Sequence, residues 1–293
     1  MQTTTASDFD VVAQGYQFIE APRVSPQGDL WFSDLTGKGV YRKRPGQGVE
    51  AMLPGREWVG GLVFDESGAV LCGGRDGIVV LDPATGATRD LLSHIEGRPV
   101  VAVNDMEADG HGGFFAGTID FAAIFERGEG PSPGILFHMS ASGDVTVLRR
   151  DVFASNGIAT SPCGRWLYHS ETSRGVWRYP LDGAGLPGSG ELLVALEDSD
   201  GLALDSLGNL WVACWSSGLL KQFSADGACL RDLSFGYPHV VSLAFGTTDP
   251  CELYIATGGN AEVSDAGAVL RMRVAIPGLP GPCTRLSALE VTA

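Results

Sequence analysis

The chain has 293 residues, 44% of them hydrophobic, and a formal net charge of -15 at pH 7. Nucleic acids and anionic membranes bind proteins through clustered lysine and arginine, so this acidic balance argues against both as partners. The hydrophobic fraction can supply a buried core, and 41 glycines with 16 prolines indicate a chain rich in turns.

Six similar units follow one another along the chain. Each begins with a leading residue, continues through a short apolar run to a turn residue eight positions later, and then enters a second apolar run. The units span 20–28, 60–68, 104–112, 156–164, 200–208 and, more weakly, 242–250. Turn residues between short β-branched and aromatic runs are typical of β-hairpins.

The period of these units predicts the fold class. Their leading residues, near 20, 60, 104, 156, 200 and 242, lie 40 to 52 positions apart, close to the length of one four-stranded propeller blade. Long apolar stretches with helical periodicity are absent. We therefore predict an all-β, six-bladed β-propeller, with four-stranded antiparallel blades around a central channel, as one domain over 1–293. Phe9 to Phe18 and Cys283 to Val291 are expected to pair or pack with the terminal blades and close the ring.

The third unit is longer than the others, and the excess falls around 121–134. This segment carries Phe121, Ile124 and Phe125 amid glycine and proline. Loops on one face of a repeat protein often line its binding site. Two interpretations stay open: a lid or pocket wall, or a plain surface insertion.

Four of the leading residues carry oxygen-bearing side chains: Glu20, Asn104, Asn156 and Asp200. At one register of the inner strands, these side chains would point at a common axis. Carboxylate and carboxamide oxygens suit Ca²⁺, Mg²⁺ or Mn²⁺, and no cysteine or histidine shares the register, which argues against a thiolate zinc site. The alternative is that they cap turns, as Asn and Asp before Gly often do. The shared register favours a metal site.

Several strings resemble the gluconolactonase/regucalcin/luciferin-regenerating enzyme family, from about Glu20 to Val274. They are Glu20-Ala21-Pro22-Arg23, Leu30-Trp31-Phe32-Ser33-Asp34, Asn104-Asp105, Asn156-Gly157-Ile158-Ala159, Asp200-Gly201-Leu202-Ala203-Leu204-Asp205 and Asn209-Leu210-Trp211-Val212-Ala213. Any one of these motifs is weak, but all of them in order at blade spacing form a strong signal.

The resemblance implies a hydrolase that opens a lactone or related ester with one divalent cation near the channel mouth. Calcium is the first expectation, with zinc, manganese, magnesium or iron as alternatives. Glu20, Asn156 and Asp200 would be the metal ligands, and Asn104 would face the substrate or bind the metal through water. Asp200 is also the candidate proton acceptor for the attacking water. Two rivals are a propeller enzyme of the lyase or condensing type and a non-enzymatic cation-binding protein.

One position departs from the family pattern. Sugar-lactone members usually carry an arginine two residues before the Asn-Asp pair, where this chain has Ala102. Arg98 lies too far back to replace it without a backbone shift. Losing this hydrogen-bond donor argues for a lactone or ester less polar than a sugar lactone. Phe121, Trp58 and Trp215 could form an apolar wall or simply belong to the blade core.

The remaining candidates concern histidine, cysteine and location. His239 could reach the channel mouth and touch substrate, whereas His111 and His138 are expected to be structural and His169 to be packed or exposed away from the axis. Six cysteines without a C-x-x-C pair indicate mostly buried free thiols in a reducing cytoplasm. The amino terminus has no signal-like pattern, and no run is long enough to span a membrane. We expect a cytoplasmic monomer or weak homo-oligomer with a small-molecule substrate.

Overall fold

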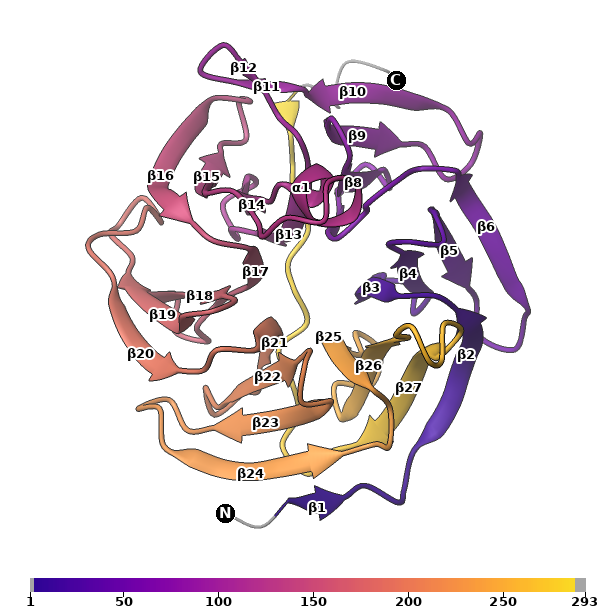
Figure 1. Cartoon of the computed structure of the whole chain (residues 1–293). Coiled ribbons are helices and arrows are strands. Elements are labelled where there is room, and N and C mark those ends of the chain that lie inside the picture. The colour runs from indigo at the N-terminus through magenta and orange to yellow at the C-terminus, as the bar shows by residue number, and fades with distance from the viewer. Residues whose placement is uncertain (1–2, 288–293) are drawn as a thin grey trace.

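Six four-stranded sheets surround a central channel like the blades of a propeller (Figure 1). The computed structural model describes residues 3–287. In blades 1 to 4 the four strands follow the chain from the channel outward, each antiparallel to the one before it. This arrangement confirms the predicted six-bladed, all-β fold.

The first three blades run from an innermost strand at the channel to an outermost strand at the rim. Blade 1 contains β3 (Ile19–Val24), β4 (Leu30–Asp34), β5 (Gly39–Lys43) and β6 (Val49–Pro54). Blade 2 contains β7 (Leu62–Phe64), β8 (Val70–Gly74), β9 (Gly77–Leu81) and β10 (Thr88–Leu92). Blade 3 contains β13 (Val103–Ala108), β14 (Phe114–Thr118), β15 (Gly134–Met139) and β16 (Val145–Val152).

The other three blades have the same order from the channel outward. Blade 4 contains β17 (Ser155–Thr160), β18 (Trp166–Glu171), β19 (Gly175–Pro180) and β20 (Glu191–Ala195). Blade 5 contains β21 (Ser199–Leu204), β22 (Leu210–Cys214), β23 (Leu219–Phe223) and β24 (Cys229–Ser234), with the short β1 (Thr4–Thr5) added outside. Blade 6 contains β25 (His239–Phe245), β26 (Glu252–Gly258), β27 (Gly267–Arg273) and, outermost, β2 (Asp10–Tyr16).

The hydrophobic core lies between the blades. The second strands β4, β8 and β22 are buried along their whole length, whereas the outer strand β6 is mostly exposed. Among the described residues, one apolar cluster fills each of the six junctions between neighbouring blades. Each blade therefore buries both of its faces only when the ring is complete.

The amino-terminal segment closes this ring. β2 pairs antiparallel with β27 and so supplies the fourth strand of blade 6, although it precedes blade 1 in the chain. Its Ala13 is buried in the cluster between blades 6 and 1, together with Ile19 and Phe32. The expected closure by Phe9 to Phe18 is thus confirmed.

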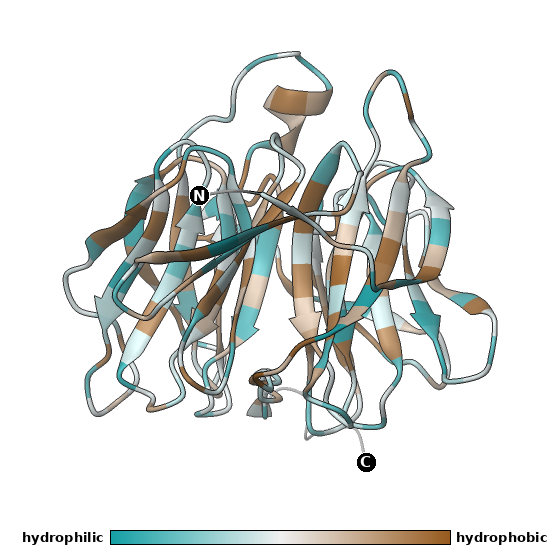
Figure 2. Cartoon of the chain, turned by 90° about the horizontal axis from the view of Figure 1, so that it is seen from below, coloured by the Kyte–Doolittle hydropathy of each residue, from teal (hydrophilic) through white to brown (hydrophobic). Residues whose placement is uncertain are grey.

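The carboxyl-terminal segment crosses the end of the channel at which the inner strands finish. Gly278 donates to the carbonyl of Pro250 beside blade 6, and Thr284 donates to the carbonyl of Phe64 in blade 2. In the side view of Figure 2 this part of the chain lies along the lower face, opposite the helix. We call residues 277–287 the strap. Cys283 to Val291 were expected to pair or pack with the terminal blades, and this is wrong through Ser287: Arg285 donates to the carbonyl of Gly112 and Ser287 to that of Ala141, both in blade 3. The remainder of that segment lies outside the described residues.

The insertion in blade 3 lies at the opposite, upper face. It contains α1 (Phe121–Phe125), a short helix to which the sequence analysis assigned no element. Asp120 caps it by accepting the amide of Ala123 at 2.9 Å. The same face carries a small hairpin of β11 (His94–Ile95) and β12 (Arg98–Pro99).

Two further expectations concern the thiols and the membrane. The six cysteines are free, but only Cys72 and Cys214 are buried; Cys163 is exposed, so the expectation of mostly buried thiols is wrong. It failed because Cys163 lies in a turn that follows the apolar run rather than inside it. Within residues 3–287 no helix is long and apolar enough to cross a membrane.

Deleting residues 1–16 should lower the melting temperature by more than roughly 10 °C in a circular-dichroism melt, because it removes β2 and exposes the junction between blades 6 and 1. Deleting residues 1–7 is the control. It removes only β1, a two-residue strand, and should cost roughly 3 °C or less. Equal losses for the two deletions would contradict closure by β2.

Candidate functional site

The inner strands carry the candidate residues at β-bulges. The pairing register shifts between Glu20 and Arg23 in blade 1, and equivalent shifts follow Val103, Ser155 and Ser199 in blades 3, 4 and 5. Asn104 directly follows Val103, Asn156 follows Ser155, and Asp200 follows Ser199, so each is the first residue inside the bulge of its strand. A bulge inserts an extra residue and re-aims the neighbouring side chains. Asn104, Asn156 and Asp200 therefore occupy one structural place, inside strands rather than at hairpin turns. Glu20 lies one register position earlier, because it is itself paired with Ser33 and precedes its bulge.

Glycines beside these residues let the inner strands approach one another closely. A Cβ added to Gly201 would lie 2.7 Å from the Cα of Ser242 in blade 6. One added to Gly157 would lie 2.2 Å from the backbone nitrogen of Leu202 in blade 5. The Asn-Gly and Asp-Gly pairs are thus needed for close approach between blades, which the turn-capping interpretation did not foresee.

A chain of hydrogen bonds joins the leading residues of blades 3, 4 and 5. The Asn104 Nδ2 donates to the Asn156 Oδ1 at 2.7 Å and to the carbonyl of Ser155 at 2.7 Å. The Asn156 Nδ2 in turn donates to the Thr172 Oγ1 at 2.7 Å, and this hydroxyl donates to the carbonyl of Ser199 at 2.6 Å. The two carboxamides are therefore fixed by buried partners before any ligand binds.

Glu20 and Asp200 converge, and within residues 3–287 neither carboxylate forms an ion pair. Burial raises the pKa of Glu20 well above its ordinary value, and the charges of Asp200 and Asp105 raise it further. Burial likewise raises the pKa of Asp200, with Asp105 and Asp198 adding to the effect. Opposing this, Arg23 lowers the pKa of Glu20. Buried carboxylates that repel one another are unfavourable unless a proton or a cation neutralises them.

This set of donors fits a hard divalent cation. Glu20 and Asp200 provide carboxylate oxygens, and the Asn156 Oδ1 can accept from Asn104 and still offer its second lone pair. Within residues 3–287 no group of three or more histidine, cysteine, aspartate or glutamate side chains is arranged to hold a metal. A cation held here would accordingly need the carboxamide oxygen of Asn156 as well as the acids.

An aromatic cluster covers the position that departs from the family pattern. Ala102 is fully buried in a cluster with Trp58 and Phe121, whose rings lie 6.1 Å apart. An arginine at 102 would have no free volume through which to reach the mouth. Arg75 lies over the Trp58 ring at 4.3 Å and pairs with Glu126 at 2.7 Å, which ties α1 to blade 2.

Two more candidates meet on the other side of the channel mouth. His239 begins β25, and its ring lies 5.6 Å from Trp215 and 5.9 Å from Phe18. The Nδ1 of His239 lies 2.6 Å from the carbonyl oxygen of Trp215, which can only accept, so this nitrogen carries the proton. Trp215 is 39% exposed. Both residues are therefore available at the upper face.

Three residues that shape this site are not among the candidates expected from the sequence. Asp105 raises the pKa of both Glu20 and Asp200, and its place beside Asn104 was the only available signal. Arg23 reaches across the channel to donate to the carbonyl of Met106 at 2.9 Å. Thr172 lies in a loop of blade 4 and had no sequence signal.

His169 is packed inside blade 4, one of the two placements expected for it, and contacts the inner strand from the second strand. Its Nε2 lies 2.8 Å from the Ser155 Oγ, one residue before Asn156. Burial, with a further contribution from Arg149, lowers the pKa of His169 to about 3, so the imidazole is neutral. A neutral ring can hold Ser155 without adding charge next to the carboxylates.

Comparison with known proteins gives a consistent family and fold. The family model described as "SMP-30/Gluconolactonase/LRE-like region" matches residues 18–259. A 6-deoxy-6-sulfogluconolactonase of Pseudomonas putida is 31% identical over 266 residues, covering 86% of this chain and 89% of the relative. A pentonolactonase of Haloferax volcanii is 28% identical over 271 residues, covering 86% and 88%. The crystal structure of a calcium-binding regucalcin from Agrobacterium tumefaciens superposes with a TM-score of 0.83 at 22% identity, covering 97% and 100%.

The converging carboxylates predict an unusual pH dependence for the cation-free protein. With raised pKa values, Glu20 and Asp200 keep protons in the folded chain at pH values where the unfolded chain has released them, so the free energy of unfolding falls as pH rises. The same holds for Asp105, whose pKa burial raises to about 6. In EDTA, the melting temperature should therefore be lower at about pH 8 than at about pH 5.5.

Calcium at about 100 times its dissociation constant should add about 2.7 kcal/mol at pH 8, and less at pH 5.5 where protons compete. Differential scanning fluorimetry measures both effects. The Asp200→Asn variant distinguishes the effect of this site from that of general charge repulsion. Its melting temperature should depend less on pH and should rise less when calcium is added. A melting temperature that rises from pH 5.5 to 8 in EDTA would contradict the assignment.

Proposed function

Because the chain belongs to the SMP-30/gluconolactonase/LRE-like family, we propose that it is a lactone hydrolase that uses one divalent cation held by Glu20, Asn156 and Asp200. The lactonase names of its relatives support the reaction class. The observation that supports the site is the convergence of buried Glu20 and Asp200 beside the fixed oxygen of Asn156. Neither carboxylate forms an ion pair within residues 3–287.

The residues of the chain have separable roles in this proposal. A cation at the site would polarise the lactone carbonyl and lower the pKa of a bound water. Asp200 accepts the proton of the attacking water, whose oxygen bonds to the carbonyl carbon. The ring C–O bond then breaks, and the proton passes to the leaving ring oxygen to give the hydroxy acid. Asn104 uses its two N–H groups to position Asn156 and Ser155, and offers its Oδ1 to the substrate.

The upper face supports a substrate less polar than a sugar lactone. The arginine that would bind sugar oxygens is replaced by buried Ala102, and the space around it is filled by Trp58 and Phe121. Trp215 and His239 border the mouth as apolar or weakly polar surface, and the exposed Phe125 ring stacks on the buried Phe121. A lactone with an alkyl substituent loses less hydration there than a polyhydroxylated one.

Chelation provides the first test of this proposal. EDTA should abolish turnover of simple γ- and δ-lactones, and one divalent cation, calcium first, should restore it.

Asp200→Asn and Glu20→Gln should each lower kcat/KM by about 10²–10⁴-fold, since each removes a carboxylate that no neighbour replaces. Glu191→Gln, which alters an exposed carboxylate on β20, is the matched control and should retain full activity. Undiminished turnover in EDTA would refute metal dependence, and a fully active Asp200→Asn would refute its role as base.

The second test concerns substrate polarity. The kcat/KM for an alkyl-substituted δ-lactone should exceed that for glucono-δ-lactone by about tenfold or more. Trp215→Ala should reduce this ratio by about tenfold, because it removes exposed apolar surface at the mouth. Leu207→Ala removes an exposed apolar side chain at the opposite end of blade 5 and should leave the ratio unchanged. A preference for the sugar lactone would overturn the assignment of substrate class.

A further inference from the structure

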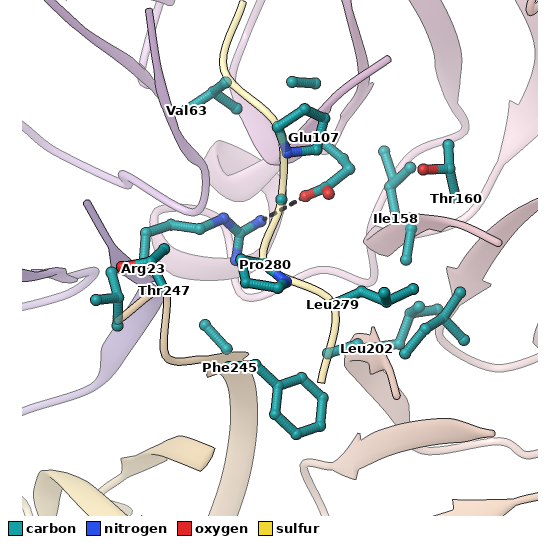
Figure 3. Close-up of a pocket in the computed structure, with 18 of the residues that line it drawn as sticks. Arg23, Val63, Glu107, Ile158, Thr160, Leu202, Phe245, Thr247, Leu279 and Pro280 are labelled. Carbon is teal, nitrogen blue, oxygen red and sulfur yellow. Dashed lines mark ion pairs between the residues drawn. The ribbon is translucent and has the colours of Figure 1, made fainter. Parts of the chain in front are cut away.

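A second cavity lies at the lower end of the channel, away from the candidate metal site. It has a volume of about 240 Å³ and lies between the ends of the inner strands and the strap. Its walls are mostly apolar, with Leu62, Ile158, Leu202 and Phe245 contributed by four different blades. Figure 3 shows these walls around two charged side chains, Arg23 and Glu107. None of the four leading residues belongs to its lining.

The strap forms the floor of this cavity. Leu279 donates to the carbonyl of Leu204 at 2.9 Å, and from there Pro280, Gly281 and Pro282 run beneath the channel. A Cβ at Gly281 would lie 2.9 Å from the Glu107 Oε1. Glycine at this position therefore leaves the carboxylate open to the cavity, while the flanking prolines restrict the backbone.

Glu107 is only loosely paired within this lining. Its Oε2 lies 3.5 Å from the nearest guanidinium nitrogen of Arg23, and its side chain is 14% exposed. The carboxylate makes no hydrogen bond within the described part of the chain. Burial raises the pKa of Glu107 to about 7, although Arg23 opposes the shift. An enclosed carboxylate of this kind favours a ligand that donates hydrogen bonds to it.

The charges around the cavity determine the sign of the charge that such a ligand should carry. Arg23 also lies 3.8 Å from Asp105, so one guanidinium faces two carboxylates. Its hydrogen bond to the carbonyl of Met106 occupies it further. Once all three groups are ionised, one negative charge is left over, and Glu107 is the acid that faces the cavity.

We propose that this lower cavity is a second binding site, for a small organic ammonium ion whose charged end pairs with Glu107 and whose apolar part contacts the walls. An ammonium group supplies three donors and the missing positive charge, which makes its bond to a buried carboxylate strong. The cavity is smaller than the ~300–1,000 Å³ of ordinary ligand pockets, so it suits an ion carrying one short alkyl chain or one ring. This site is independent of the proposed hydrolysis.

Three isosteric probes of different charge test the proposal. Benzylammonium, benzyl alcohol and benzoate have similar shapes, so their affinities report charge recognition. Isothermal titration at pH 8, with calcium saturating the upper site, should show one saturable site for benzylammonium, at least tenfold tighter than for benzyl alcohol. Benzoate should not bind. Equal affinity for the alcohol, preference for benzoate, or no binding by any probe would each overturn the proposal.

Variants locate the binding site within the channel. Glu107→Gln keeps the shape of the side chain and should weaken benzylammonium at least tenfold, while Glu107→Met should lose its preference over the alcohol. Glu191→Gln is the surface control, and circular dichroism verifies folding of each variant. Asp200→Asn should leave affinity unchanged. Binding that Asp200→Asn removes and Glu107→Gln retains would assign the ion to the upper site and refute the proposal, without bearing on lactone hydrolysis.

Discussion

Closure of the ring is the constraint on which the rest of this structure depends. Each of the six junctions between neighbouring blades holds its own apolar cluster, and within the described residues no blade has a second layer to cover its faces. The last junction forms only because β2, from the start of the chain, completes blade 6 and buries Ala13 against blade 1. Because β2 and β27 lie at opposite ends of the chain, all six blades must be in place before the ring closes and the channel forms.

The same closure creates the candidate metal site and makes it electrostatically unfavourable. Bulges aim Glu20 and Asp200 inward, and Gly157 and Gly201 let the strands that carry them pack closely. The core of the fold holds these carboxylates in place, where burial, with the charge of Asp105 adding to it, raises the pKa of both. The stable fold holds the two carboxylates in this unfavourable arrangement, and a bound cation would relieve it. Cation affinity and fold stability are therefore linked.

Arg23 divides the channel into two chemically different ends. Its guanidinium donates to Met106 from across the channel and lies between Asp105, which acts on the upper carboxylates, and Glu107, which faces the lower cavity. The upper end collects oxygen donors beside an aromatic rim, whereas the lower end is an apolar chamber closed by the strap. The single guanidinium of Arg23 therefore lies near acids at both ends of the channel without neutralising either set completely.

The sequence alone was sufficient for the fold and for assigning the candidate residues to the inner strands. The period of its units fixed six blades, and the shared register singled out Glu20, Asn104, Asn156 and Asp200, because propeller symmetry converts a repeat position into a place on one axis. Only the tertiary structure decided which partners those residues have. Thr172, Arg23 and the strap glycine Gly281 act through contacts between segments far apart in the chain. Such contacts leave no local pattern in the sequence, since they depend on how neighbouring blades pack.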